Sequence, residues 1–494
     1  MSDLSPGAGS PDKDPATAAE TAKAAAHDTP DADGTPAVPD AGGPTSGEPG
    51  AGPSGAGAPP GTPWAGAPPG TPTRQRAGRP DGDGPDRAPS FAQAFVQQLW
   101  AANTVMVTVL ALVLAGVIGA ILIIISDPDV LATYGYFTSR PSDALTASWT
   151  VVSEAYANLF KGAIIDPDAV LDWLSGGGTG WQQVVYPISE TLTYATPLIF
   201  TGLAVALVFR GGLFNIGAQG QATLGVIVAA LAGFLLPLPL GLHVIVALLA
   251  GVLGGAIWGF VPGFLKARTG AHEVITTIML NYVALNLLAW TINQRGVHDP
   301  SRSDAISRPV DASAQLPRLL GDVPRVHAGI LLAVLATAGV AWLLNRSTFG
   351  FELRAVGANP DAARTAGISV TRTYVLMMVI SGALAGLGGA NMVVGTTASS
   401  LTAQVVAQIG FDGILVALLG RVKPWGVLAA GLLFGALQAG GNRMQSYSGI
   451  SLELVTVLQA LIVIFIAAPA LVKAIFRLRA ARAARLQTSL AKGW

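Results

Sequence analysis

The sequence predicts an all-α polytopic membrane protein of about ten transmembrane helices, with broken helices and two related halves. Hydrophobic residues make up 51% of the 494 residues and charged residues only 12%, and the mean hydropathy is +0.52. These values are typical of chains whose solvent is the bilayer. Apolar runs of about 20 residues, long enough to cross the hydrocarbon layer, recur along the chain. Because cysteine is absent, disulfides, thiolate nucleophiles and Cys-ligated metal centres are excluded.

Residues 1–90 are predicted to form a disordered cytoplasmic tail. They consist mainly of Ala, Gly, Pro, Asp, Ser and Thr, and include the near-repeat GAPPGTPWAGAPPGTP. Such a segment cannot bury enough apolar surface to offset the entropy of ordering. The tail holds 12 acidic and 6 basic side chains, whereas residues 91–494 hold 17 and 23. The net charge of zero therefore conceals an acidic tail and a basic remainder.

Residues 91–472 are predicted to form the transmembrane domain. Its ten expected spans are 105–125, 185–208, 213–235, 241–264, 274–292, 326–344, 374–395, 405–420, 425–441 and 452–472. An even number of spans places both termini on one side of the membrane. Residues 473–494 carry six basic and no acidic side chains, so the positive-inside rule makes them a basic cytoplasmic tail.

This orientation agrees with most of the predicted loops. The basic loops at Lys266 and Arg268, at 345–373 and at 421–423 fall inside, and the acidic segment 126–184 falls outside. The loop 293–325 should be external, yet it has five Arg against four Asp. We keep the orientation that the C-terminal tail and the other loops indicate, because their charge imbalance is larger. Within the external segment, the apolar stretch Ala144–Phe160 is partly amphipathic and suits the membrane surface.

The polar loop 345–373 is predicted to contain a short helix, because the sequence has both a start signal and a stop signal for it. Asn359 suits the N-cap, Pro360 the first helical position, Asp361 the positive end of the helix dipole and Gly367 the left-handed stop. The helix Pro360–Ala366 has about two turns, whereas an isolated helix needs roughly 12 to 15 residues in water. It therefore needs a surface to dock on, and its predicted cytoplasmic side suggests a soluble partner.

Glycine and amide residues interrupt the apolar pattern between the second and third spans, at 210–221. Irregular backbone at membrane depth is tolerated only where it packs in protein or lines a wet cavity. Uncharged amides there and within other spans suit hydrogen bonds to a polar solute; alternatively, they satisfy freed backbone groups while the glycines allow close helix packing. The candidate solute-path residues are Asn215, Gln219, Gln221, Asn281 and Asn391.

Ionisable residues are nearly absent from the middle of the spans. The acids Glu190, Glu273, Asp412 and Glu453 sit near predicted span ends, where interfacial solvation or a helix N-terminus explains them as well as a transport role does. Two similar stretches, LAGVLGGA from Leu249 and LAGLGGA from Leu384, suggest an internal duplication and hence two related halves.

Four segments together resemble a known family. They are GLFNIGAQGQ (Gly212–Gln221), EVITTIMLNYVALN (Glu273–Asn286), RAVGANPDAARTAGI (Arg354–Ile368) and GFDGILVALLG (Gly410–Gly420). In that order they resemble the larger permease subunit of bacterial ABC importers for nucleosides and related compounds, over about residues 105–472. Sugar and branched-chain amino-acid permeases are more distantly similar. The 90-residue tail is extra, and Gln219 stands where many relatives have Glu.

The resemblance implies a multi-pass protein of the bacterial cytoplasmic membrane with several partners. These are a second, similar permease, ATP-binding cassettes on the cytoplasmic side and an extracytoplasmic substrate-binding lipoprotein. The loop 352–368 matches the segment that docks into the ATPase and couples it to transport. The expected coupling residues are Glu352, Arg354, Asn359, Pro360, Asp361, Arg364 and Gly367.

The chain has no GxxxxGK[ST] phosphate loop, so a partner has to hydrolyse ATP and the chain itself is not expected to be an enzyme. We expect no cofactor, no metal and no nucleic-acid partner. Neutral amides suit a nucleoside, and a sugar or another neutral polar solute remains an alternative. An ion-coupled secondary transporter would need paired acids or His within the spans. A membrane-embedded enzyme would need convergent catalytic groups, and the five His form no ligand-spaced pair.

Overall fold

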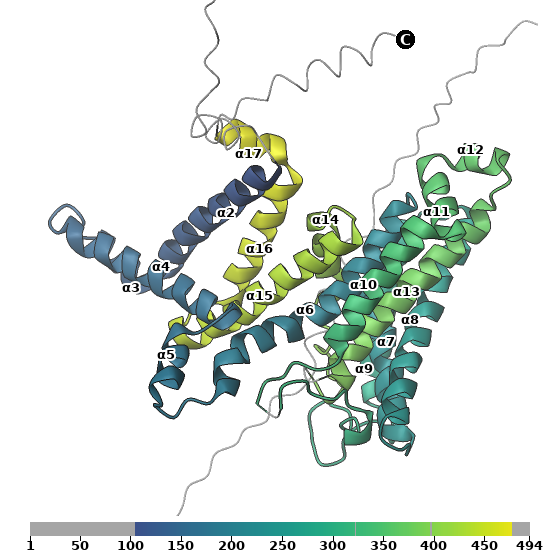
Figure 1. Ribbon diagram of the computed structural model, residues 1–494, viewed down its shortest axis with the longest axis horizontal. Helices are drawn as coiled ribbons and strands as arrows, with labels where there is room; N and C mark the ends of the chain where they lie inside the picture. The colour runs from purple at the N-terminus through teal and green to yellow at the C-terminus, as the bar shows by residue number, and fades with distance from the viewer. Residues whose placement is uncertain (1–103, 322, 396–397, 477–494) are drawn as a thin grey trace, which may run out of the picture. The chain divides into compact units, whose positions relative to one another are not determined.

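The computed structural model describes residues 104–321, 323–395 and 398–476. These residues form helices and one 3-10 turn, with no strand beyond two isolated bridges (Figure 1). The all-α class is therefore confirmed. The predicted tail 1–90 lies outside the described residues, and so does the predicted tail 473–494 from residue 477 onward. The helices are α2 (Thr104–Ser126), α3 (Pro128–Tyr134), α4 (Pro141–Ala163), α5 (Pro167–Ser175), α6 (Trp181–Arg210), α7 (Ala218–Leu235), α8 (Leu242–Thr269), α9 (Glu273–Ile292), α10 (Gly329–Arg346), α11 (Thr348–Ala358), α12 (Pro360–Thr365), α13 (Val370–Val394), α14 (Ile409–Leu419), α15 (Pro424–Ser448), α16 (Leu452–Ala467) and α17 (Pro469–Ile475).

Each of the ten predicted spans contains a helix, and the span 452–472 is divided between α16 and α17. Seven of the described helices, α2, α6, α7, α8, α9, α10 and α13, are long and apolar enough to cross a membrane. The predicted span 405–420 is shorter than expected, because its helix α14 begins only at Ile409 and has 11 residues. Helix α16 has 16 residues. The apolar stretch Ala144–Phe160 is helical within α4 and packs on α15.

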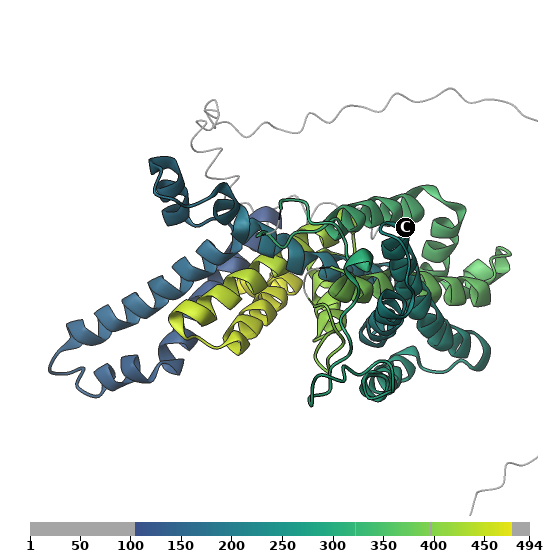
Figure 2. The ribbon, with the colours of Figure 1, turned by 90° about the horizontal axis from the view of Figure 1, so that it is seen from below.

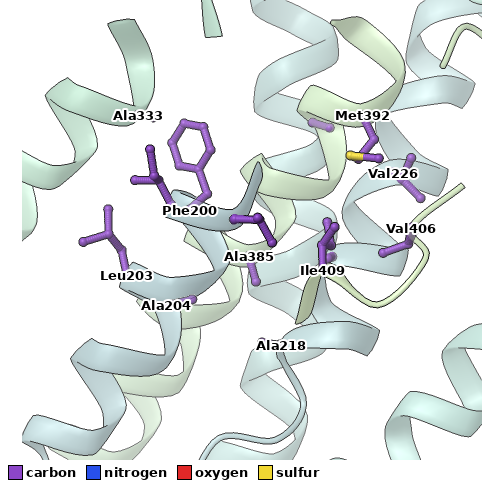
Figure 3. Packing of buried hydrophobic residues seen from close by; sticks show 14 of the residues in the cluster. Phe200, Leu203, Ala204, Ala218, Val226, Ala333, Ala385, Met392, Val406 and Ile409 are labelled. Atoms are coloured by element: carbon purple, nitrogen blue, oxygen red, sulfur yellow. The ribbon is translucent and has the colours of Figure 1, made fainter. Parts of the chain in front are cut away.

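Helix α6 is the central element of the packing. It contacts α10, α13, α14 and α15, and its segment Ala195–Val208 is buried throughout. Figure 3 shows Phe200 and Leu203 of α6 in the same apolar cluster as Ala385 and Met392 of α13. A helix that is apolar on all sides belongs inside a bundle. Pro187 and Pro197 lie within α6, as is tolerated in membrane helices that pack against neighbouring helices.

Helices α7, α8 and α13 pack closely through glycine. A Cβ atom on Gly255 of α8 would overlap the backbone of Gly382 and Gly386 of α13, and one on Gly386 would overlap Gly251. Gly225 of α7 meets Gly386 in the same way. The stretches LAGVLGGA and LAGLGGA, which suggested two related halves, therefore face one another across this interface, where small residues allow the backbones to approach.

A second group of helices lies on the other side of α6. Helices α2 and α4, blue in Figure 2, lie beside α15 and α16, in yellow, and share one apolar cluster with them. Gly440 of α15 meets the backbone of Leu159 of α4 without room for a Cβ atom. Helix α6 thus stands between the glycine-packed group α7, α8 and α13 and the group α2, α4, α15 and α16.

One end of the bundle holds α11 and α12, where α6 and α10 finish and α13 and α15 begin (Figure 1). We call it the α12 end. The loop 293–328 and α5 lie at the opposite end, the α5 end (Figure 1).

Candidate functional site

The irregular segment 211–217 between α6 and α7 carries the centre of an amide network. The fully buried Asn215 donates from Nδ2 to Gln221 Oε1 at 2.9 Å and to Ser381 Oγ at 2.8 Å, and its Oδ1 accepts from the backbone N–H of Gly217 at 2.9 Å. Ser381 in turn donates to the carbonyl of Ala204 at 2.7 Å. The predicted interruption of the helices is confirmed here, and the amide side chains in it link α6, α7 and α13.

Gln219 supports a different irregular segment, the turn that leads into α14. Its Nε2 donates to the carbonyl of Ala407 at 2.7 Å, and its Oε1 accepts from the N–H of Gly410 at 2.8 Å. Ala407 has a φ of 41°, a left-handed conformation that is costly for a residue with a Cβ atom. The Gln219 carboxamide therefore stabilises the strained turn at Ala407 through two backbone hydrogen bonds.

The other two predicted amides also bond within the protein. Asn281 accepts from the N–H of Gly220 at 2.8 Å and donates to the carbonyl of Ile216 at 3.0 Å. Asn391 donates to the carbonyl of Leu387, while its buried Oδ1 has no hydrogen-bond partner among the described residues. None of the five predicted solute-path residues lines either of the two cavities described next.

A polar cavity of about 490 Å³, which we call the chamber, lies between the two helix groups. This volume falls within the usual range of small-molecule sites, about 300–1,000 Å³. Its walls combine apolar side chains with amides, hydroxyls and one carboxylate, and the lining residues are Tyr194, Pro197, Leu198, Met392, Ala398, Thr402, Gln404, Val405, Ala407, Gln408, Ile409, Asp412, Gln438, Thr456 and Gln459. The chamber contains uncharged amides at positions other than the five predicted ones.

A second cavity, the vestibule, has a volume of about 480 Å³ and lies nearer the α5 end. Two ion pairs close its walls. Arg325 forms a bidentate pair with Glu190, with Nε to Oε1 at 2.8 Å, and Arg443 Nη2 donates to Asp166 Oδ2 at 2.6 Å. The Glu190 carboxylate raises the pKa of Arg325 above its ordinary value. Glu190, predicted as an interfacial acid, therefore has a cation partner at the vestibule wall.

Tyr194 lines both the vestibule and the chamber. Its hydroxyl accepts from Asn442 Nδ2 at 2.9 Å and from Arg325 Nη2 at 3.3 Å. The phenol ring thus stands between the two cavities and is tied to α15 and to the loop before α10. Tyr194 and the chamber glutamines carry no signal in the sequence that distinguishes them from ordinary packing residues.

At the α12 end, the short predicted helix is present. It runs from Pro360 to Thr365, one residue shorter than expected, with Ala366 as its C-cap and Gly367 at a φ of 83°. Asn359 Oδ1 accepts from the N–H groups of Asp361 and Ala362, both at 3.0 Å, as the capping signals predicted.

Helix α12 docks on its own chain through one residue. Ala363 is buried against Val356 of α11 and Val370 of α13, while the other five residues of α12 are exposed. Arg364 Nη1 pairs with Asp361 Oδ1 at 3.0 Å on the exposed face. The sequence missed α11, which the hydroxyl of Ser347 caps by accepting from the N–H of Gly350. Two helices, rather than one helix in a loop, thus form this end.

Comparison with known proteins identifies the class. The family model described as branched-chain amino acid transport system / permease component matches residues 188–467. The chain belongs to this family of membrane permease components.

Individual relatives carry more specific names. The guanosine ABC transporter permease protein NupP of Bacillus subtilis is 39% identical over 63% of this chain and 90% of its own length. The nucleoside ABC transporter permease protein NupB of Lactococcus lactis is 40% identical over 57% of this chain and 79% of its own length. The glucose ABC transporter permease protein TsgB13 of Haloferax volcanii is 36% identical over 57% and 76%.

The relatives come in pairs of permeases. The chain also matches the guanosine ABC transporter permease protein NupQ of Bacillus subtilis and the nucleoside ABC transporter permease protein NupC of Lactococcus lactis, at 29% and 26% identity. No solved structure matches this chain.

Proposed function

We propose that this chain is the membrane-spanning permease subunit of an ATP-binding cassette importer for a nucleoside or a related polar solute. The observation that carries the proposal is the similarity to guanosine and nucleoside permeases along most of their length. The chamber supports it, because four glutamine amides and a carboxylate within apolar walls suit a neutral solute with a flat ring and several hydroxyls.

In the proposed mechanism, the solute enters through the vestibule, passes Tyr194 and reaches the chamber. The α5 end then faces outward and receives solute from an extracytoplasmic lipoprotein, and the α12 end faces the cytoplasm. A second permease completes the membrane part, as in the paired relatives. ATP is hydrolysed by a separate cassette subunit that presses on the exposed face of α12.

Glucose is a second candidate solute, because one of the relatives is a glucose permease. A rival mechanism, ion-coupled transport, would need paired acids or His within the spans. Competition of labelled guanosine uptake by unlabelled nucleosides and by glucose, in vesicles that contain the complete transporter, separates the two solutes. Stronger competition by glucose would reject the nucleoside assignment.

The coupling role of α12 is tested by the double variant Pro360→Gly and Arg364→Glu. Losing the preset first turn and reversing an exposed charge should separate ATP hydrolysis from uptake, while the chain still inserts. The readout is the ratio of solute transported to ATP hydrolysed in reconstituted vesicles. Arg268→Glu, a charge reversal on the exposed end of α8, is the matched control. An unchanged ratio in the double variant would contradict the coupling assignment.

A further inference from the structure

A basic cavity at the α12 end is not explained by solute passage. It has a volume of about 300 Å³ and lies between the ends of α6 and α10, the middle of α11 and the start of α15. Its lining contains three cations and no acid: Arg210, Ala341, Leu344, Asn345, Arg354, Lys423, Pro424, Trp425 and Gly426. None of the three cations forms an ion pair with a described residue.

One nitrogen of the Arg354 side chain, which lines the cavity, has no hydrogen-bond acceptor among the described residues. Its Nη1 is buried and makes no hydrogen bond within the described part of the chain. A buried guanidinium nitrogen without a partner costs free energy comparable to a lost charged hydrogen bond, which is why such groups are normally paired. Because Arg354 lines the cavity, an anion there would lie beside this guanidinium group.

The turn that precedes Lys423 has a strained backbone. Arg421 and Val422 have φ values of 53° and 55°, which are strained for any residue with a Cβ atom and most of all for a β-branched one. Arg210 Nε donates to the carbonyl of Val422 at 3.0 Å and so supports this turn. Strained backbone of this kind concentrates at sites with a function.

The start of α15 adds a further attraction for negative charge. The helix has 25 residues, and no side chain caps its N-terminus at Lys423. The N–H groups of Trp425 and Gly426 therefore remain without a side-chain acceptor next to the cavity. Free N–H groups and the positive end of a helix dipole favour phosphate or carboxylate.

The surroundings select a lipid as the source of that anion. The cavity lies where the candidate spans α6 and α10 end, which is the depth of the membrane interface. Along α10, Leu331, Leu335 and Trp342 are exposed at 54%, 66% and 62% and form an apolar stripe that leads to Asn345 at the cavity. Trp425 is also 56% exposed, and tryptophan is enriched at this depth. Acyl chains fit the stripe while a headgroup occupies the cavity.

We propose that this cavity binds the phosphate headgroup of an anionic phospholipid. Arg354 and Lys423 contact the phosphate, and Arg210 positions the turn that presents Lys423. Basic pockets between membrane helices are well suited to such headgroups. The assignment differs from the role that family resemblance gives Arg354, because the side chain faces this cavity rather than the exposed surface of α12.

The test is native mass spectrometry of the purified full-length protein with added phosphatidylglycerol or with phosphatidylcholine of the same acyl chains. The wild type should retain phosphatidylglycerol selectively. The double variant Arg354→Gln and Lys423→Gln should lose about 30-fold in affinity, or about fivefold for each charge. Arg268→Gln with Arg372→Gln, two exposed cations outside the cavity, should bind as the wild type does.

Three results would overturn the proposal. The first is equal retention of the two lipids by the wild type, and the second is undiminished retention by the Arg354 and Lys423 variant. The third is displacement of the lipid by millimolar inorganic phosphate, which would assign the cavity to a soluble anion. Because a variant can fail to fold, the melting temperature of the wild type is also measured in each lipid. It should be higher in phosphatidylglycerol, since a ligand that binds only the folded state stabilises it. Equal melting temperatures would contradict the assignment without any mutation.

Discussion

Replacing Gln219 by Leu tests whether this amide supports the chamber or touches the solute. The side chain is 2% exposed and is held by two hydrogen bonds, to the carbonyl of Ala407 and from the N–H of Gly410. Leucine has a similar volume but no polar atom, so the substitution removes both bonds without leaving a large cavity. The two backbone groups behind the chamber then have no partner.

The expected loss of stability follows from the different surroundings of these two groups. Gly410 is buried, so its unpaired N–H should cost about 1–3 kcal/mol. Ala407 borders the chamber, where water can replace the amide, and the loss of its hydrogen bond should cost about 1 kcal/mol. The strained φ of Ala407 should then relax. We expect Gln219→Leu to lower the free energy of unfolding by about 2–4 kcal/mol.

The assay combines a thermal melt of the purified protein with the ratio of uptake for two nucleosides. Gln219→Leu should lower the melting temperature and reduce uptake of both solutes alike, because the wall that it supports is displaced. Gln408→Leu is the reciprocal control: this exposed amide lines the chamber and caps nothing with its side chain. It should leave the melt unchanged and alter the uptake ratio. A wild-type melt with an altered ratio for Gln219→Leu would refute the reasoning and restore direct solute contact.

Three other substitutions test the packing and the two ends of the bundle. Gly386→Ala should destabilise the protein by about 1–3 kcal/mol, because its Cβ atom would overlap α8; Gly339→Ala in α10, which has open space around it, should be neutral or slightly stabilising in the same melt. Asn359→Ala should cost about 1 kcal/mol at the N-cap, seen as faster amide exchange in α12, and unchanged exchange would contradict the cap. Glu190→Gln should lower the melting temperature by leaving Arg325 without its carboxylate. Adding Arg325→Gln to that variant should recover part of the loss, and fully additive losses would exclude direct coupling of the two side chains.

The spans could be predicted because long apolar runs and a membrane leave few alternatives. All ten predicted spans contain helices, and the break at 211–217 was visible as a run of glycine and amide residues. The cap of α12 was equally local, since Asn359 and Pro360 act within their own turn. Where a physical effect is confined to neighbouring residues, the sequence suffices to predict it.

The candidate site was harder to predict, because an amide looks the same whether it faces solute or backbone. Asn215 and Gln219 were chosen for lying in a broken helix, yet the same break frees the backbone groups that they satisfy. The chamber glutamines Gln404 and Gln438 come from segments far apart in the sequence, so only tertiary packing brings them together. Helix α11 was missed because it is short, with 11 residues, and contains two glycines, Gly350 and Gly357, which lower its helix propensity.

The close packing of α13 against α8 and α7 has a mechanical consequence. Helix α13 has 25 residues and is therefore about 37 Å long; Val370 near one end contacts α12, and Met392 near the other lines the chamber. The glycine contacts leave no free space for α13 to slide past α8, so we expect the three helices to tilt as one rigid unit. A tilt of about 5° would displace Met392 by about 3 Å. Gln219 belongs to the same unit and is bonded to the turn at Ala407, so such a tilt would shift one wall of the chamber relative to α15 and α16.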